Sequence, residues 1–431
     1  MNHLRQPFTR RALVLLGLAL AVIVTLPGCS GLLGLGAEPV TIKFAYLDGA
    51  ADYGPLAEAF HEKYPNITVE LNPVKSTGGP GANPVNTLIQ KAEEVDAIRI
   101  GSISVNEKLV SGFLPLDTYI TTDKNFPSED LISGSLKGLN VGGKQLGIPA
   151  SVTPYVIFYD PAMFLAKGVT PPAAGWTLED FMTTAMAMTS TDEAAIGTSA
   201  YTYGFCSNVQ FGDPIMFAYV FGGGIVDSLT ALTAPTLNSQ ANIESLTWYA
   251  SLRNEFGIMP SPVGDRQVGE LVIRSNCGFW MDWLDRSWFG GWMNNREVSA
   301  LPLPNYGSSQ YAIATLDTYS IMAESLHPDE TWKWLRFLLD QPTASGSLVP
   351  PRWSIIDNQE FTTHAASDVV GVAQSLPQQT IILGLELYQD PRLGEMVELY
   401  ANATINVLNQ ETDAMTALDN AQQQAEQLFD N

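Results

Sequence analysis

Apolar and polar residues along residues 40–100 follow two patterns in turn. One is the pattern of β-strands and the other is the spacing of an α-helix. Residues 40–46 and 67–71 have the pattern of half-buried strands. Between them, residues 54–63 carry apolar side chains at helical spacing, and Pro65 ends that helix. A strand, a helix and a strand within about 30 residues make a βαβ unit, so the pattern predicts an α/β fold with mostly parallel sheets.

Helix-start signals recur later in the chain. Thr177 and Asp180 have the spacing of a capping box, and Pro328 precedes two acidic residues that favour a helix N-terminus. Residues 391–429 carry apolar side chains near helical spacing and predict two helices. We expect the tryptophans beside the first two starts, Trp176 and Trp332, to pack in the core.

The N-terminus combines three arginines, an apolar run over residues 12–24 and the sequence Leu26-Pro27-Gly28-Cys29. The run is too short to span a bilayer comfortably, and its order is that of an export signal. The ending resembles a bacterial lipobox, so we predict a signal peptide at 1–28, lipidation of Cys29 and a flexible tether at 29–38. A plain signal or a signal anchor is the alternative. The prediction places the protein on the extracytoplasmic face of the cell membrane.

Composition narrows the function. With 16% charged and 45% hydrophobic residues in 431 positions, the chain can build two domains with large cores. Removing the three arginines of the signal leaves 19 basic against 45 acidic residues, a formal charge of −26. Such a charge opposes nucleic-acid binding and discourages anionic ligands.

Cysteine and histidine usage gives no indication of a metal or another cofactor. Beyond Cys29, only Cys206 and Cys277 remain; in an oxidising compartment they form either a disulfide or two buried thiols. The histidines of the mature chain are widely spaced and have no paired ligand spacing. We therefore expect no metal site and no cofactor.

Seven segments together resemble a known family. They are Thr41–Leu71, Gly147–Asp160, Gly175–Phe181, Phe221–Gly224, Cys277–Met281, Ala300–Pro304 and His327–Leu339. In their order and spacing the chain resembles the extracellular solute-binding proteins of ABC importers, in particular the sugar-binding group similar to maltose-binding protein. The resemblance covers nearly the whole mature chain and agrees with the lipobox.

The resemblance implies two α/β lobes that enclose a ligand between them. The first lobe would comprise 39–150 and 306–347, and the second 155–303 and 352–431. The chain would cross between lobes near 150–154, 303–305 and 349–351, where proline-rich segments suit a hinge. The ligand would favour the closed form, which a monomeric binding protein would present to membrane permeases.

Candidate ligand residues follow from the chemistry of sugars, which offer apolar faces and rings of hydroxyls. Residues 280–291 hold the densest cluster of aromatic and charged side chains, led by Trp280, Asp282 and Trp283, with Asp285, Arg286, Trp288 and Gly290-Gly291 behind them. The other candidates are Asp48, Asp52, Asp96, Tyr155, Phe221, Gly223, Tyr319 and Arg352. Asp48 and Asp52 have a turn or helix cap as the alternative, Asp96 a structural role, Phe221 and Gly223 an ordinary turn, and one or two of the tryptophans a place in the core.

Two other functions stay open at this stage. The negative charge and the aromatic-plus-acid cluster would also suit a cation such as a polyamine. The pairs Asp282/Asp285 and Asp48/Asp52 could serve glycoside hydrolysis, but acid pairs are common by chance in a chain with 45 acids. No nucleophile elbow, triad spacing or phosphate loop is present, so we expect a binding protein without catalysis.

Overall fold

The computed structural model describes residues 38–75, 83–198, 200–229, 232–261, 265–285, 296–307 and 309–430. Residues 40–431 form one compact unit. Cys29, the export signal and nearly all of the tether lie outside the described residues, as do Arg286, Trp288 and Gly290-Gly291. No helix in the described part is both long and apolar enough to cross a membrane.

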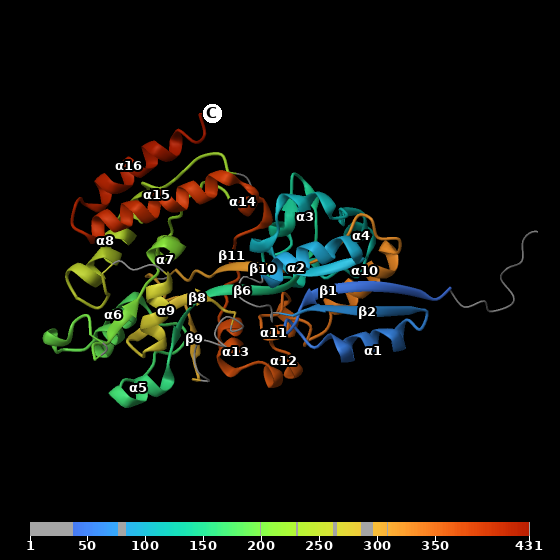
Figure 1. Cartoon of the computed structure of the whole chain (residues 1–431), viewed down its shortest axis with the longest axis horizontal. Helices are drawn as coiled ribbons and strands as arrows, with labels where there is room; N and C mark the ends of the chain where they lie inside the picture. Colours follow the sequence, from blue (N-terminus) through green and yellow to red (C-terminus); the bar gives the residue numbers. More distant parts are fainter. Residues whose placement is uncertain are drawn as a thin grey trace, which may run out of the picture. The chain divides into compact units, whose positions relative to one another are not determined.

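Strands β1, β2, β3, β10, β6, β8 and β7 form one continuous path of hydrogen-bonded neighbours, in the order β2-β1-β3-β10-β6-β8-β7 (Figure 1). The strands are β1 (Val40–Leu47), β2 (Ile67–Val74), β3 (Ala97–Gly101), β4 (Asn140–Val141), β5 (Lys144–Gln145), β6 (Ile148–Tyr159), β7 (Tyr203–Cys206), β8 (Cys277–Trp283), β9 (Ser299–Pro302), β10 (Ile313–Ile321) and β11 (Ile381–Ile382). β9 pairs with β6 and β11 with β10, while β4 and β5 pair separately. The α/β class is thus confirmed, in a mixed sheet.

The long strand β6 belongs to both halves of this sheet. Its first part pairs antiparallel with β10, from Ile148 to Pro154. Its second part, from Tyr155 to Tyr159, pairs antiparallel with β8, and residues 156–159 also pair with β9. The neighbours farther out are parallel, β1 with β2 and β3 on one side and β7 with β8 on the other. β6 therefore carries the chain directly from one parallel group to the other.

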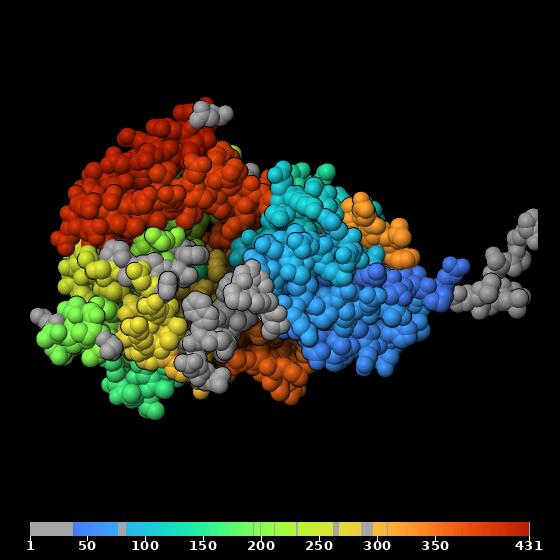
Figure 2. All heavy atoms as spheres, viewed as in Figure 1, coloured from blue at the N-terminus to red at the C-terminus, as the bar shows by residue number. Residues whose placement is uncertain are grey.

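The described residues form sixteen α-helices. They are α1 (Tyr53–Lys63), α2 (Pro84–Lys91), α3 (Glu107–Gly112), α4 (Asp117–Thr122), α5 (Pro161–Lys167), α6 (Leu178–Met188), α7 (Asp213–Val220), α8 (Gln240–Asn254), α9 (Asp265–Ile273), α10 (Pro328–Leu338), α11 (Trp353–Ile356), α12 (Gln359–His364), α13 (Ser367–Gln374), α14 (Leu385–Gln389), α15 (Pro391–Leu408) and α16 (Ala414–Glu426). Distant segments lie together: α15 and α16, red in Figure 2, contact α8, and α10 contacts α1.

The helix-start signals and helical spacings in the sequence correspond to helices in the structure. Thr177 and Asp180 form the capping box of α6, with the Asp180 carboxylate accepting from the Thr177 backbone N–H at 2.8 Å. Helices α10, α15 and α16 occupy the predicted ranges, and Trp176 and Trp332 are buried. These predictions are confirmed because caps and helical spacing act within a few residues of the chain.

Three apolar clusters form the core. One lies within residues 42–150 and 319–344, and we call it the first core. Another, the second core, draws on residues 155–303, on Ile313 and on residues 383–425. The third cluster takes residues from both halves, including Val152, Val156 and Leu316, and we call it the shared core. Apolar packing on one face of the sheet is therefore continuous, whereas packing on the other face is divided.

The structure joins Cys206 and Cys277 in a disulfide, with a Cα–Cα distance of 5.8 Å. Cys206 ends β7 and Cys277 begins β8, and both side chains are buried in the shared core. The bond closes a sequence separation of 71 residues. It constrains the unfolded chain over this long segment while adding little to the packing of two strands that already pair.

We expect the double variant Cys206→Ala/Cys277→Ala to lose about 4 kcal/mol of unfolding free energy, the chain-entropy value for a loop of this length. Urea unfolding of a soluble chain beginning at Ser30, which lacks Cys29, measures the difference. The native disulfide is buried, so reductant should change the wild type only after unfolding. A loss below about 1 kcal/mol would contradict this account of the bond.

Candidate functional site

Polar residues interrupt the divided face of the sheet between the first and second cores. On β6, Val152 and Val156 face the shared core, so Ser151 and Thr153 face the other way. On β10, Thr315 and Asp317 pair with these two residues, and Arg99 of β3 shares their face. We call Arg99, Ser151, Thr153, Thr315 and Asp317 the polar band. It crosses three adjacent strands where apolar packing stops.

Arg99 is the structural centre of the polar band. Its guanidinium is buried, with 2% exposed, and donates to six acceptors. These are Asp317 Oδ2 at 2.9 Å, the Tyr53 hydroxyl at 2.9 Å, Ser151 Oγ at 3.3 Å and the carbonyl oxygens of Ala50, Ala344 and Ser345 at 3.0–3.2 Å. One side chain thereby fixes the loop after β1, the central strands and the segment before the third predicted crossing.

The neighbours of Arg99 keep its guanidinium charged in spite of burial. Burial alone would lower the pKa of Arg99, but Tyr53, Asp317 and Tyr319 outweigh that effect and raise it above its usual value. The Asp317 carboxylate is the partly exposed member, with 22% of its side chain accessible. Arg99 holds one of its oxygens, which leaves Asp317 Oδ1 to accept from a group in solvent.

A second group of side chains lies four residues further along β6. Tyr155 pairs with Trp283 of β8, and their rings meet edge-to-face at 4.8 Å. The Tyr155 hydroxyl donates to Asp213 Oδ1, while Ser207 Oγ and the Asn208 N–H donate to Oδ2 at 2.9 and 2.7 Å. Burial raises the pKa of Asp213 to about 7. Trp283 is half-buried, so part of its ring is accessible.

The structure brings three of the candidate residues together. Tyr155, Asp282 and Trp283 lie where β6 and β8 begin to pair, and the Asp282 carboxylate accepts from the Trp283 N–H at 2.7 Å. Asp48 is exposed directly after β1, on the loop that Arg99 holds through Ala50. Ligands of open α/β sheets bind beyond the carboxyl ends of strands, which is where Asp48 and Trp283 lie.

Two aromatic candidates are core residues in this conformation. Tyr319 is 1% exposed, and its hydroxyl contacts Tyr53 at 3.1 Å and the Ala344 carbonyl at 3.2 Å. Trp280 faces the shared core and stacks on Phe158, with ring centroids 6.0 Å apart. Neither ring has a face to offer a ligand here, because β-strand alternation turns both toward buried neighbours.

Four polar or glycine candidates have structural duties. Asp52 caps α1, and Asp96 accepts from the Lys43 N–H at 2.8 Å and from Ser325 Oγ at 2.6 Å. Arg352 pairs with Asp130 at 2.7 Å and also with Asp340. Gly223 lies so close to Asn242 that an added Cβ would be 2.0 Å from its side-chain oxygen. At these four positions the observed contacts are therefore structural ones.

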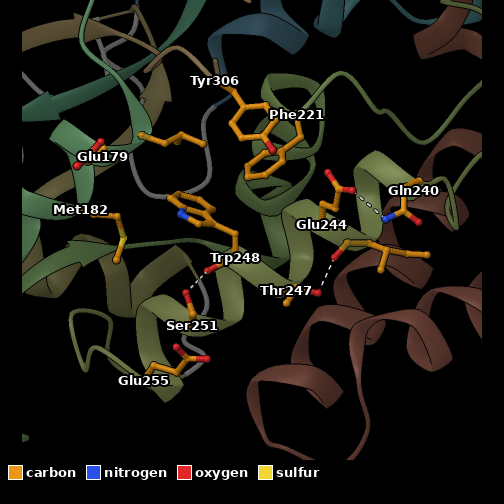
Figure 3. A pocket seen from close by; sticks show the side chains of 12 residues that line it. Glu179, Met182, Phe221, Gln240, Glu244, Thr247, Trp248, Ser251, Glu255 and Tyr306 are labelled. Carbon is orange, nitrogen blue, oxygen red and sulfur yellow. Dashed lines mark hydrogen bonds between the residues drawn. The ribbon is translucent and has the colours of Figure 1, made fainter. Parts of the chain in front are cut away.

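The remaining candidate, Phe221, borders a separate groove of about 690 Å³ (Figure 3). Its ring stacks on Tyr306 at 4.2 Å, and Trp248 of α8 forms the adjacent wall. Twelve side chains line the groove, none of them from the polar band: Leu178, Glu179, Met182, Phe221, Gln240, Ile243, Glu244, Thr247, Trp248, Ser251, Glu255 and Tyr306. Of the candidate residues, only Phe221 lines this groove.

Sequence reasoning missed Arg99, Asp317 and Asp213. A signal for Arg99 was present, because a charged residue within the apolar strand 95–100 must find buried partners. Asp317 carries no comparable local signal, since its partner Arg99 is 218 residues away. Asp213 has near neighbours in Ser207 and Asn208, but its link to the candidate site is Tyr155, which is 58 residues away. Within the described ranges, no three His, Cys, Asp or Glu side chains converge on a metal-binding position.

Comparison with known proteins gives the family and the fold of this chain. Residues 46–344 match the family model described as bacterial extracellular solute-binding protein. An uncharacterized ABC transporter extracellular-binding protein from Pyrococcus horikoshii is 22% identical over 303 residues, which are 66% of this chain and 64% of that relative. The chain thus spans somewhat less than two thirds of that relative's length.

Solved structures show the same two-lobed fold. The sugar-binding protein MalE from Xanthomonas citri superposes with a TM-score of 0.67 at 16% identity, covering 90% of this chain and 97% of MalE. UgpB from Mycobacterium tuberculosis, in complex with glycerophosphocholine, gives 0.63 at 15% identity and covers 92% and 99%. Because the family model matches well over half of the sequence, this chain belongs to the bacterial extracellular solute-binding protein family.

Proposed function

We propose that this protein captures a carbohydrate between two lobes and delivers it to the permeases of an ABC importer. The polar band carries the proposal, because it places a carboxylate held by Arg99 and several hydroxyls where the apolar packing of one sheet face stops. Asp317 and Asp48 would accept from sugar hydroxyls, and the accessible part of Trp283 would stack on a sugar face. The high negative charge disfavours an anionic solute.

Relatives support the solute class and the delivery step. The structural neighbours include proteins bound to cycloalternan, α-D-tagatose, maltose, maltotetraose and D-mannitol. The relative from Pyrococcus horikoshii bears the name of an ABC transporter component. The proposed role is binding without catalysis, with the carboxylates acting as acceptors for ligand hydroxyls. Release of free monosaccharide from an oligosaccharide would contradict it.

The lobe boundaries of this proposal are 39–150 with 306–347 and 155–303 with 352–431. The first core draws only on the first pair of ranges, and the second core draws on the second pair except for Ile313. Two of the three predicted crossing segments are hydrogen-bonded to each other, since the Val152 N–H donates to the Val349 carbonyl at 2.9 Å. A bend near residues 150–154 would then move both segments together, as hinge closure requires.

A thermal-shift panel of mono- and oligosaccharides on the chain beginning at Ser30 tests the proposal. A sugar at 100 times its Kd should add about 2.7 kcal/mol and raise Tm by roughly 3 °C for a chain of this length. For the sugar found, Asp317→Asn should weaken binding roughly tenfold to a hundredfold, the value of a hydrogen bond to a charged group.

Glu58→Gln is the matched control, because it removes one negative charge from an exposed site on α1 that is not part of the polar band. It should leave the Kd unchanged. The unfolding temperature of Asp317→Asn must be recorded as well, since Arg99 loses part of its ion pair. Equal Kd values for wild type and Asp317→Asn would remove the polar band from the ligand site.

The groove beside α8 favours a second candidate function, the binding of an organic cation such as a polyamine. Three exposed glutamates, Glu179, Glu244 and Glu255, surround the half-buried ring of Trp248, as Figure 3 shows for all four. None of the three glutamates forms an ion pair in the described part of the chain. Aromatic faces with carboxylates nearby attract alkylammonium groups.

Calorimetric titration with spermidine tests this candidate. Glu179→Gln and Glu255→Gln should each weaken spermidine binding roughly twofold to fivefold, as expected for an exposed ion pair, while Glu58→Gln should not. Saturating sugar should leave this binding unchanged if the cation occupies the groove. Displacement of spermidine by sugar would instead place both ligands at the polar band, and absence of heat would dismiss the cation.

We also propose a lipid anchor at Cys29 and a location on the extracytoplasmic face of the membrane. The Leu-Pro-Gly-Cys ending at residues 26–29 supports it. In a bacterial host, the full chain should fractionate with membranes and Cys29→Ala should remain as an uncleaved or soluble form. The amount of protein in the membrane fraction and the incorporation of a labelled lipid distinguish the wild type from Cys29→Ala. An unlabelled wild type that leaves the membrane in high salt would contradict the anchor.

A further inference from the structure

Asp213 is an unusual carboxylate, because it is fully buried without a cationic partner. Only 1% of the residue is exposed, and no lysine, arginine or histidine in the described residues forms an ion pair with it. A buried charge without a counter-ion is costly, and such departures concentrate at functional sites. The proposed function leaves this residue without a role.

Four donor groups surround or support the carboxylate. Tyr155 of β6 donates to one oxygen, and Ser207 Oγ and the Asn208 N–H donate to the other. The Tyr249 hydroxyl of α8 donates in turn to Ser207 Oγ. Asp213 is also the first residue of α7, where the helix dipole favours a negative charge. These donors and the helix dipole favour the ionised form and offset part of the effect of burial.

Tyr155 links this cluster to the candidate ligand site. Its hydroxyl is held by Asp213, and its ring meets Trp283 edge-to-face at 4.8 Å. Trp283 is half-buried and ends β8, so the orientation of its accessible face depends on the ring beneath it. A charge-assisted hydrogen bond fixes the Tyr155 ring more firmly than a neutral one.

We propose that Asp213 is a positioning residue for the carbohydrate site, because its buried carboxylate holds Tyr155 against Trp283 and so fixes the indole face that stacks on the ligand. The inference rests on the proposed function. Protonation of Asp213 replaces the charge-assisted bond by a neutral one and loosens the pair. Ligand affinity is therefore coupled to the charge of a residue that never touches the ligand.

The groups that face Asp213 determine how it titrates. Burial raises its pKa to about 7, the bonds from Tyr155, Asn208 and Ser207 lower it, and Asp282 at the end of β8 raises it. Tyr249 on α8 has a pKa well above its usual value, because of burial and then of Asp213, so it stays neutral. Tyr155 likewise stays neutral, because burial and then Asp213 raise its pKa. Asp213 is thus the group of this cluster that changes charge near neutral pH.

The first test is the affinity for the sugar found by the panel, measured from pH 8 to pH 6. Wild-type affinity should fall severalfold as Asp213 takes up a proton. Asp213→Asn should bind about tenfold more weakly at pH 8 and show no change over this window. A wild-type affinity that is flat with pH, or an unchanged Kd in Asp213→Asn, would overturn the proposal.

A second readout needs no ligand, so its failure can be told apart from failure of the sugar hypothesis. In protein labelled with 5-fluorotryptophan, the resonance missing from Trp283→Phe belongs to Trp283. It should move with pH in the wild type with a midpoint near 7, and stay fixed in Asp213→Asn. A Trp283 resonance that does not titrate would overturn the proposal even if sugars bind.

Variants of Tyr155 and Tyr400 separate positioning from general packing. Tyr155→Phe keeps the ring and should reproduce the Trp283 shift of Asp213→Asn, and the double variant should be no worse than either single one. Tyr400→Phe is the matched control, because it removes a buried hydroxyl without a partner in the same core. Additive losses in the double variant, or an equal shift in Tyr400→Phe, would contradict the link.

Stability provides a check on the titrating group itself. The folded-state pKa of about 7 lies above the ordinary value for aspartate, so the folded protein binds the proton first. Wild-type stability therefore rises as pH falls from about 7 toward 4. The Tm of the wild type relative to Asp213→Asn should increase over this range, and a constant difference would assign the titration to another group.

Discussion

The buried guanidinium of Arg99 is the interaction on which the rest of the site depends. A charge with 2% exposure is tolerated only if its donors are satisfied, and here six acceptors from five parts of the chain satisfy them. Those parts include the loop after β1 and the segment that leads into the third predicted crossing. Removing Arg99 would therefore loosen the loop after β1 and the segment before the third predicted crossing together.

Two differently held carboxylates contact β6 through residues only four positions apart, Asp317 beside Ser151 and Asp213 at Tyr155. Asp317 is paired with Arg99 and partly exposed, so it can offer a fixed oxygen to a ligand. Asp213 has neutral donors only and is buried, so its charge is conditional on pH. The first arrangement suits direct recognition of hydroxyls, and the second suits control of an aromatic neighbour.

The division of the apolar packing explains how one sheet can serve a two-lobed protein. The shared core packs without interruption against one face of β6 and β10 across the junction. On the other face the first and second cores stop short of each other, and the polar band lies in the interval. Polar residues there avoid sealing the two halves into a single core, which would prevent a ligand from entering between them.

The sequence by itself determined the features that act within a few residues: the strands and helices that it predicts, the capping box of α6 and the buried tryptophans. The export signal and the lipobox stay predictions. It also contained a family resemblance that the comparisons confirm. Only the tertiary structure decided the site. Strand alternation turned Trp280 and Tyr319 inward. Asp317 and Asp213 became candidates only through Arg99 and Tyr155, which are 218 and 58 residues away from them in the sequence. An aspartate that caps a helix, such as Asp52, cannot be told in the sequence from one that pairs with a buried arginine, such as Asp317. The difference lies in partners that only folding brings close.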